Sequence, residues 1–248
     1  MKCLIKTVFW LLSVFVGFIA IGLGYLKVND TVREKFFART MNAFSNENDT
    51  AITNIRCNQV LNHASVHGHV LEIGSGTGIN FVCLHNNTRI KDYIGIEPNI
   101  HMHSYMQETI NRWQIQFPVR ISGVSAATMT DIESDSIDTI IMTFVLCSVP
   151  DPFAKQILLE AYRVLKPGGQ FHLIEHVLSD PNIKPMTNSF QKLIEPIWTI
   201  VGDGCRFKPI VNYLDEMKTI YSNVEHENIE LPVPFFIIKD GLKAVLTK

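Results

Sequence analysis

The chain has two different patterns of apolar and polar residues. Residues 7–26 form one uncharged apolar run, whereas from residue 69 onward short apolar runs alternate with segments of helical spacing. A helix of roughly 20 residues covers the ~30 Å hydrocarbon core of a bilayer. We therefore predict a membrane anchor at residues 1–27, a juxtamembrane helical segment at 28–68 and a folded domain at 69–248.

Charges flank the apolar run on both sides, so its orientation depends on a small difference. Lys2 and Lys6 precede the run, and Lys27, Arg33 and Lys35 follow it. Cytoplasmic flanks of membrane helices carry the excess of Lys and Arg. The slightly larger downstream charge favours a folded domain on the cytosolic side.

A cleaved signal peptide is the alternative, because Gly22 and Gly24 offer small residues for cleavage. The apolar run is longer than the ~7–15 residues usual for a signal peptide, which favours the uncleaved anchor. Glycosylation sequons at 48–50 and 86–88 would be modified only if the domain entered a secretory lumen. Their modification would therefore report the topology.

The folded part alternates strand patterns with helix patterns, which is typical of an α/β, doubly wound, mostly parallel sheet. The run at 137–145 is continuously apolar and rich in β-branched residues, as a buried parallel strand requires. We predict strands at 69–73, 93–97, 137–145 and 170–177. Helices are predicted at 52–63, at 152–165 and at 183–201, with one more that starts at about 78 and another that follows the second strand and ends at 113. A closing antiparallel pair of strands is predicted at 228–232 and 241–248.

Charge and cysteine usage narrow the function classes. The 248 residues include 22 basic and 24 acidic ones, giving a net charge of −2 without long runs of one sign. Nucleic acid is therefore not expected as a partner, because phosphate binding leaves a basic patch. The cysteines show no CxxC spacing, which predicts neither a zinc site nor a disulfide framework and favours reduced thiols facing the cytosol. They are Cys3, Cys57, Cys83, Cys147 and Cys205.

A glycine-rich turn follows the first predicted strand. Glu72 lies at the end of that strand, and Gly74, Gly76 and Gly78 occupy alternate positions in the turn. Glycine allows the backbone to approach a ligand closely. Glu97 ends the next strand, 97 − 78 = 19 residues past the last glycine. A carboxylate about 20 residues on is suited to accept hydrogen bonds from both hydroxyls of a ribose.

The spacing E-x-G-x-G-x-G resembles the first motif of class I S-adenosylmethionine-dependent methyltransferases with a type 11 domain, because Ile79 stands where a dinucleotide site needs its third glycine. The resemblance implies a seven-stranded Rossmann-like sheet with an antiparallel edge strand, S-adenosyl-L-methionine as cofactor, and no metal. Residues 69–248 would be the methyltransferase domain. The implied cofactor-binding residues are Glu72, Gly74, Ser75, Gly76, Gly78, Glu97, Pro98, Asn99, Ser125, Ala126 and Thr143.

One segment departs from the family pattern. Methyltransferases of this type commonly place an acidic residue after the third strand to contact the adenine amino group, whereas residues 123–129 read GVSAATM. Backbone or hydroxyl contacts from Ser125 and Ala126 are expected instead.

Four further motifs narrow the resemblance. LCSVPD at 146–151, RVLKPGG at 163–169, EHV at 175–177 and EPIWTIVGDGC at 195–205, behind an N-terminal anchor, are similar to the membrane-anchored methyltransferase-like thiol S-methyltransferases. This implies methylation of small lipophilic thiols at the endoplasmic reticulum or a lipid droplet, with the domain facing the cytosol and residues 7–26 in the membrane. The alternatives are methylation of a lipid or quinone oxygen or carbon, and cofactor binding without turnover.

Methyl transfer from a sulfonium is an in-line displacement, so the enzyme mainly aligns the reactants and excludes water. His176, at the carboxyl end of the strand predicted at 170–177, is a candidate base or thiolate stabiliser, and Asp203 is the second catalytic candidate. A hydrogen-bonded strand-end histidine and a turn aspartate are the alternative roles. Trp198, Phe190 and Phe207 are candidates for the wall of an apolar acceptor pocket or for ordinary packing.

Overall fold

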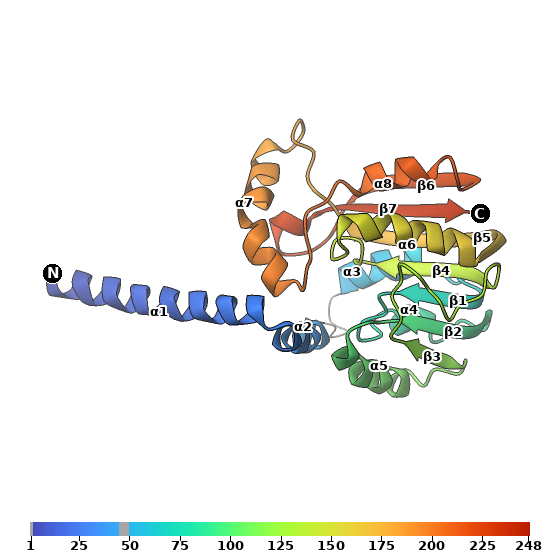
Figure 1. Ribbon diagram of the computed structural model, residues 1–248, viewed down its shortest axis with the longest axis horizontal. Helices are drawn as coiled ribbons and strands as arrows, with labels where there is room; N and C mark the ends of the chain where they lie inside the picture. The colour runs from blue at the N-terminus through green and yellow to red at the C-terminus, as the bar shows by residue number, and fades with distance from the viewer. Residues whose placement is uncertain (1, 45–49) are drawn as a thin grey trace.

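A seven-stranded sheet forms the centre of the molecule in a computed structural model that describes residues 2–44 and 50–248 (Figure 1). The strand order is β3-β2-β1-β4-β5-β7-β6. The strands are β1 (Gly68–Ile73), β2 (Ile90–Ile96), β3 (Val119–Ser122), β4 (Ile137–Thr143), β5 (Leu165–His176), β6 (Asn223–Glu230) and β7 (Asp240–Thr247).

Helices and helical turns connect these strands and precede them. They are α1 (Lys2–Val28), α2 (Asp30–Phe44), α3 (Thr50–Ile55), the π-helical turn η1 (Arg56–Val60), α4 (Phe81–Leu84), α5 (Ile100–Arg112), α6 (Asp151–Val164), α7 (Pro185–Val201), α8 (Ile210–Met217) and the 3-10 turn η2 (Phe236–Ile238).

The pairing confirms the predicted fold class. β1 pairs in parallel with β2 and β4, and β4 pairs in parallel with β5. β7 is antiparallel to both β5 and β6, so the predicted closing pair is present. The strand order reverses direction between β1 and β4, and in open α/β sheets a ligand binds beside the carboxyl ends of the strands at such a point.

Two hydrophobic cores cover the two faces of the sheet, because successive strand residues point to opposite sides. Leu71 and Ile73 of β1 lie in one core with the buried faces of α6 and α8. Val70, one residue before Leu71, lies in the other core with Val60 of η1 and Phe81 of α4. The continuous apolar strand patterns follow from burial on both faces.

The N-terminal helices lie at the carboxyl edge of the parallel strands. Figure 1 shows α1 projecting away from the sheet, α2 beside the ends of β1 and β2, and α7 at the same edge. α1 contacts both α2 and α7. Among the described residues no single helix is both long and apolar enough to span a membrane. One pair of helical segments in this part of the chain, Ser13–Val28 and Asp30–Ala43, is long and apolar enough when taken together, and the two segments meet at a bend of 109°.

Three elements differ from the sequence expectation. The helix expected from about residue 78 is the single turn α4, since Asn87 is buried and donates through its side chain to the carbonyl of Val66, 2.7 Å away. The helix expected at 52–63 becomes α3 followed by the π-helical turn. β5 begins at Leu165, five residues earlier than expected, and includes Gly168 at φ +78°.

The expectation of no disulfide is wrong. Cys57 of η1 and Cys83 of α4 are joined by a disulfide, with Cα atoms 4.9 Å apart. Their sequence separation of 26 gave no recognisable spacing, because the bond depends on how η1 packs on α4. The argument from reduced thiols for a cytosolic domain therefore does not extend to this pair.

Candidate active site

The turn between β1 and α4 has three left-handed glycines. Gly74, Gly76 and Gly78 have φ values of +68°, +55° and +79°. A Cβ on Gly74 would lie 2.4 Å from a methyl group of Val145, so the turn packs directly on the loop after β4. A Cβ on Gly76 would meet nothing within 4 Å. The turn is therefore tightly packed on one side and open at Gly76.

Glu97 at the end of β2 connects this turn to α5. Its Oε2 accepts a hydrogen bond from the backbone N–H of Gly76 at 2.8 Å, and its Oε1 accepts one from the N–H of Asn99 at 2.9 Å. Burial raises the pKa of Glu97 above its usual range, although these two bonds oppose the rise. His103 of α5 contacts the Glu97 carbonyl through Nε2 at 2.8 Å.

Glu72 lies beneath the turn and faces protein rather than open space. Tyr93 donates a short hydrogen bond to one carboxylate oxygen, and Asn80 donates to the other at 2.8 Å. Burial raises the pKa of Glu72 to about 7. Arg56, itself buried, donates to the side-chain oxygen of Asn80 at 2.8 Å. Glu72 thus fixes the shape of the turn, and no sequence spacing pointed to Arg56 or Asn80.

The remaining predicted cofactor residues surround the turn unevenly. Thr143, at the end of β4, accepts a bond from Asn80 at 3.0 Å. Ser75 is buried against Met106 of α5. Asn99 caps α5 by accepting from the N–H of His101 at 3.0 Å. Pro98 and Ser125 are exposed, whereas Ala126 is half-buried beside Ser125 in the turn after β3.

These residues fit S-adenosylmethionine. The open space over Gly76 leaves room for a ligand against the backbone. Each carboxylate oxygen of Glu97 accepts one hydrogen bond from a backbone N–H and has capacity for another, as two ribose hydroxyls require. Gly76 and Glu97 would hold the cofactor at the carboxyl ends of β1 and β2, where the topology places a ligand.

Helix α2 closes over this edge of the sheet. The side-chain amide of Asn99 donates to the carbonyl of Glu34 on α2 at 3.0 Å. Arg33 of α2 donates through Nε to Asp203 at 2.8 Å, in the loop that follows α7. The pair raises the pKa of Arg33, with the hydrogen bond to Asp203 as the largest cause. Asp203, the second catalytic candidate, is therefore positioned to secure α2.

Double-mutant kinetics will distinguish the two roles of Asp203. We expect Arg33→Ala and Asp203→Ala each to slow methyl transfer by about fivefold, because a partly exposed ion pair contributes about 1 kcal/mol. The double variant should be no worse than either single variant. If Asp203→Ala instead slows transfer far more than Arg33→Ala, Asp203 has a chemical role of its own. Arg39→Ala, an exposed position on the same helix, is the matched control.

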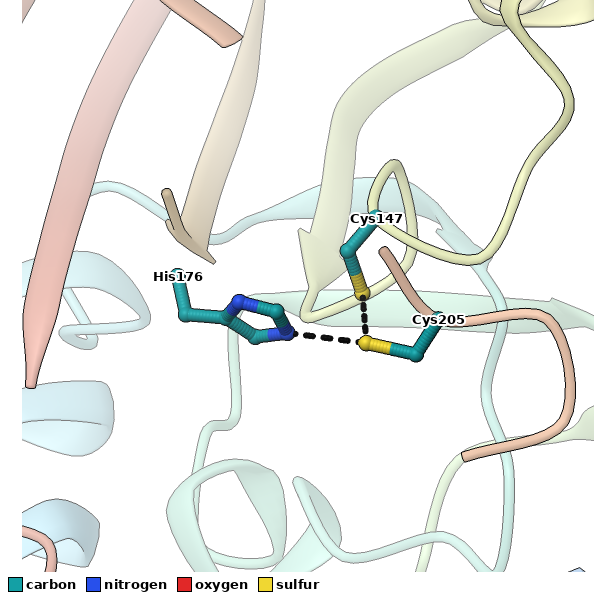
Figure 2. A group of neighbouring side chains, drawn as sticks. All are labelled: Cys147, His176 and Cys205. Carbon is teal, nitrogen blue, oxygen red and sulfur yellow. Dashed lines mark hydrogen bonds between the residues drawn. The ribbon is translucent and has the colours of Figure 1, made fainter. Parts of the chain in front are cut away.

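The other catalytic candidate, His176, lies in a buried cluster with two cysteines. Its Nε2 is 3.0 Å from Sγ of Cys205, and that sulfur is 3.2 Å from Sγ of Cys147 (Figure 2). The hydrogen bond with Cys205 and burial raise the pKa of Cys147 well above its usual value. Burial lowers the pKa of His176, but interaction with Cys147 outweighs this and raises it overall. We call these three residues the Cys147–His176–Cys205 cluster.

Aromatic side chains enclose the cluster. Phe144 stacks on the ring of His176 at 6.5 Å between centroids, and Phe207 meets it edge-on at 5.9 Å. Trp198 stacks on Phe207 at 5.7 Å. Phe190 lies elsewhere, exposed on α7 and beside Phe236. Of the three aromatic residues predicted to line an acceptor pocket, Phe207 therefore contacts the His176 ring, Trp198 lies behind Phe207, and Phe190 lies elsewhere.

Glu175 fixes the loop that follows β4. One carboxylate oxygen accepts from the N–H groups of Val145 and Leu146 at 2.7 and 2.8 Å. The side chain is fully buried, and burial raises its pKa to about 7. The carboxyl group thus helps to hold the loop that carries Phe144 and Cys147.

This carboxyl group should make the protein less stable as the pH rises. Between about pH 4.5 and 7 the unfolded chain loses the Glu175 proton while the folded protein retains it. The resulting loss is about 3 kcal/mol, complete above pH 7. Urea unfolding from pH 4.5 to 7.5 measures this loss. Over that range the unfolding free energy of Glu175→Gln should fall by about 3 kcal/mol less than that of the wild type. An unchanged slope would mean that Glu175 is ionised when folded. The exposed Glu108→Gln serves as control.

A cavity of about 380 Å³ lies away from these groups. It is lined by His69, Asp92 and Val119, towards the amino ends of the parallel strands. Ligands of open α/β sheets bind at the opposite edge. The glycine turn, Glu97 and the cluster are therefore the better candidate for chemistry.

Comparisons with known proteins agree with this geometry. Residues 71–173 match a family model described as a methyltransferase domain. The chain is 28% identical to human thiol S-methyltransferase TMT1A, over 72% of this chain and 70% of that protein. It is 31% identical to rat thiol S-methyltransferase TMT1B, over 64% of this chain and 62% of the relative.

A relative with a different acceptor and a solved structure complete the comparison. A demethylmenaquinone methyltransferase of Lactiplantibacillus plantarum is 28% identical over 55% of this chain and 52% of its own. The crystal structure of a putative S-adenosylmethionine-dependent methyltransferase from Methanococcus maripaludis has a TM-score of 0.58 at 19% identity, covering 85% of this chain and 91% of that one, which shows the shared fold. The matches span between about half and seven tenths of the three relatives.

The glycine turn, Glu97, the strand order and the family model lead to one conclusion. Residues 71–173 belong to a class I S-adenosylmethionine-dependent methyltransferase domain, and the chain as a whole resembles the thiol S-methyltransferases.

Proposed function

We propose that this protein transfers a methyl group to the sulfur of small lipophilic thiols at a membrane surface. The observation that carries the acceptor class is the likeness to two thiol S-methyltransferases over most of the chain. The surroundings of His176 support it, because aromatic rings enclose the imidazole and favour an apolar acceptor. The demethylmenaquinone relative keeps a quinone acceptor as the second candidate.

The chemistry requires alignment and a deprotonated acceptor. S-adenosylmethionine supplies a methyl group made electrophilic by its positively charged sulfonium. Glu97 and the glycine turn would hold the ribose and the amino-acid part of the cofactor. A free thiol with a pKa of about 8.5 is only a few per cent ionised at neutral pH. His176 remains the candidate base or thiolate stabiliser, and the aromatic rings beside it would exclude water.

The membrane part of the proposal is supported by an apolar surface on α1 and α7. The exposed side chains are Trp10, Phe15, Phe18 and Ile21 on α1, and Met186, Leu193 and Ile197 on α7. The two helices contact each other at the edge of the sheet that carries the cluster. A contiguous exposed apolar surface of this kind marks a membrane or protein contact. We infer a membrane of the endoplasmic reticulum or a lipid droplet, with the methyltransferase domain, residues 69–248, in the cytosol.

Vesicle binding tests the membrane contact. We expect the full chain to sediment with phosphatidylcholine vesicles, and a variant lacking residues 2–28 to remain in the supernatant, since most of the apolar area would be gone. Leu193→Glu with Ile197→Glu should weaken binding without abolishing it. Vesicle binding that is unchanged in both variants would contradict this surface. Glycosylation of the exposed Asn86, lost in Asn86→Gln, would contradict the cytosolic orientation.

An acceptor panel tests the reaction itself. With labelled S-adenosylmethionine, we expect the label in lipophilic alkyl and aryl thiols and not in phenols or quinols of matched size. Label in quinols alone would support the second candidate. Cofactor binding by calorimetry without label in any acceptor would indicate a binding protein without turnover. The sequon at 48–50 lies largely outside the described residues.

A further inference from the structure

Three segments far apart in the sequence bring the Cys147–His176–Cys205 cluster together. Cys147 comes from the loop after β4, His176 ends β5, and Cys205 follows α7 (Figure 2). The three potential ligand atoms lie within 4.8 Å of one another, and all three residues are at least nine-tenths buried. Nδ1 of His176 has no hydrogen-bond partner among the described residues, so Nε2 makes the ring's one contact of this kind.

Two thiols and an imidazole are a ligand set that zinc prefers. Zinc binds sulfur at about 2.3 Å and nitrogen at about 2.0 Å in a tetrahedron, which separates two sulfurs by about 3.7 Å and sulfur from nitrogen by about 3.5 Å. The sulfurs of Cys147 and Cys205 are 3.2 Å apart, and Nε2 of His176 is 3.0 Å from Cys205. These two distances are each within about half an ångström of the tetrahedral values, and all three ligand atoms lie within 4.8 Å of one another, so modest side-chain movements would accommodate the ion.

Charge and surroundings also fit a buried ion. Two thiolates neutralise Zn²⁺, so the buried site would carry no net charge before the acceptor thiolate binds. The indole N–H of Trp198 donates to Sγ of Cys205 at 3.2 Å. The backbone N–H of Arg206 donates to the carbonyl of Cys147 at 3.0 Å. Contacts of this kind orient metal ligands and stabilise a thiolate.

We propose that Cys147, His176 and Cys205 hold a zinc ion whose fourth position receives the sulfur of the acceptor thiol. Three protein ligands and one open position are the arrangement of catalytic zinc. The cysteine spacing along the chain gave no sign of this site, because its members meet only in the folded sheet. The zinc site stands on the cluster, whereas its role as acceptor site rests on the proposed thiol methyltransferase function.

The proposed site lies next to the cofactor turn. Val145, which contacts Gly74 in that turn, is two residues from Cys147. A thiol that binds zinc gives up its proton to solvent and stays a thiolate at neutral pH. Its sulfur lone pair forms the new bond to the methyl carbon while the bond from methyl to sulfonium breaks. That electron pair remains on the donor sulfur, so both products are neutral thioethers, which bind zinc more weakly than a thiolate.

Metal content and cobalt spectroscopy test the site in the full chain purified in detergent. We expect about one zinc ion per chain in the wild type, and below about one in ten in Cys147→Ser, Cys205→Ser and His176→Gln. His172→Gln is the matched control, since this buried histidine lies on the same strand outside the cluster. Circular dichroism of each variant separates metal loss from unfolding. With Co²⁺ in place of zinc, a lipophilic thiol should intensify the sulfur-to-cobalt charge-transfer absorption.

The outcomes separate this inference from the proposed function. Folded wild type that takes up no zinc when it is offered in equimolar amount overturns the inference, as does a Cys147–Cys205 disulfide in protein kept under reductant. Thiol methylation at an unchanged rate after complete zinc removal overturns the acceptor role and leaves the function standing. Stoichiometric zinc without any thiol methylation supports the metal site and contradicts the function.

Discussion

Replacing Glu97 by alanine is expected to weaken the binding of S-adenosylmethionine by about 100-fold or more. Two ribose hydroxyls would each lose a hydrogen bond to a charged acceptor, worth about 1.5–3 kcal/mol apiece. The backbone N–H groups of Gly76 and Asn99 would also lose their shared partner, so the turn would be held less firmly. Isothermal titration calorimetry measures the dissociation constant directly.

Two further variants make the Glu97 result specific. Glu97→Gln keeps one side-chain oxygen acceptor and should bind the cofactor with intermediate affinity. Glu108→Gln, an exposed carboxyl on α5, should bind as the wild type does. Unchanged affinity in a folded Glu97→Ala variant would show that the ribose lies elsewhere. A lowered melting temperature alone would assign Glu97 a structural role.

Replacing Gly74 by alanine should mainly reduce stability, whereas replacing Gly76 by alanine should mainly reduce cofactor binding. We expect Gly74→Ala to destabilise the fold by about 3 kcal/mol or more, because overpacking adds to the strain of a positive φ. Its new Cβ would lie 2.4 Å from Val145. Gly76→Ala should destabilise it by only about 1 kcal/mol, since φ is positive but the Cβ meets open space.

Cofactor binding should rank the two variants the other way. The Gly76 methyl would project into the space proposed for the ligand, so Gly76→Ala should lose affinity while remaining folded. Urea unfolding and calorimetry on both variants give the comparison. Equal losses of stability, or full affinity in Gly76→Ala, would contradict the placement of the ligand over this turn.

The features that were predicted correctly depend on residues close together in the sequence. Alternation of apolar strands and amphipathic helices indicated the sheet, and the spacing from Glu72 to Glu97 indicated the ligand edge. Both signals are short in sequence, because a turn and two strands must be adjacent to form them. The family model covers the glycine turn, and both therefore point to the same cofactor.

Features formed by distant segments had no such signal. Arg33 and Asp203 are 170 residues apart, and only the packing of α2 beside α7 brings them together. Cys57 and Cys83 pair because η1 packs on α4. Glu72 is a conspicuous strand-end carboxylate, yet its bonds to Asn80 and Tyr93 direct it into the protein. Contacts of this kind require the tertiary structure.

The most direct test of the account is methyl transfer from labelled S-adenosylmethionine to a panel of lipophilic thiols, phenols and quinols, with wild type and Glu97→Ala measured side by side. We expect label on thiol sulfur alone, falling by about 100-fold in the variant at cofactor concentrations below its dissociation constant. Wild type that binds the cofactor but labels no thiol would contradict the proposed function.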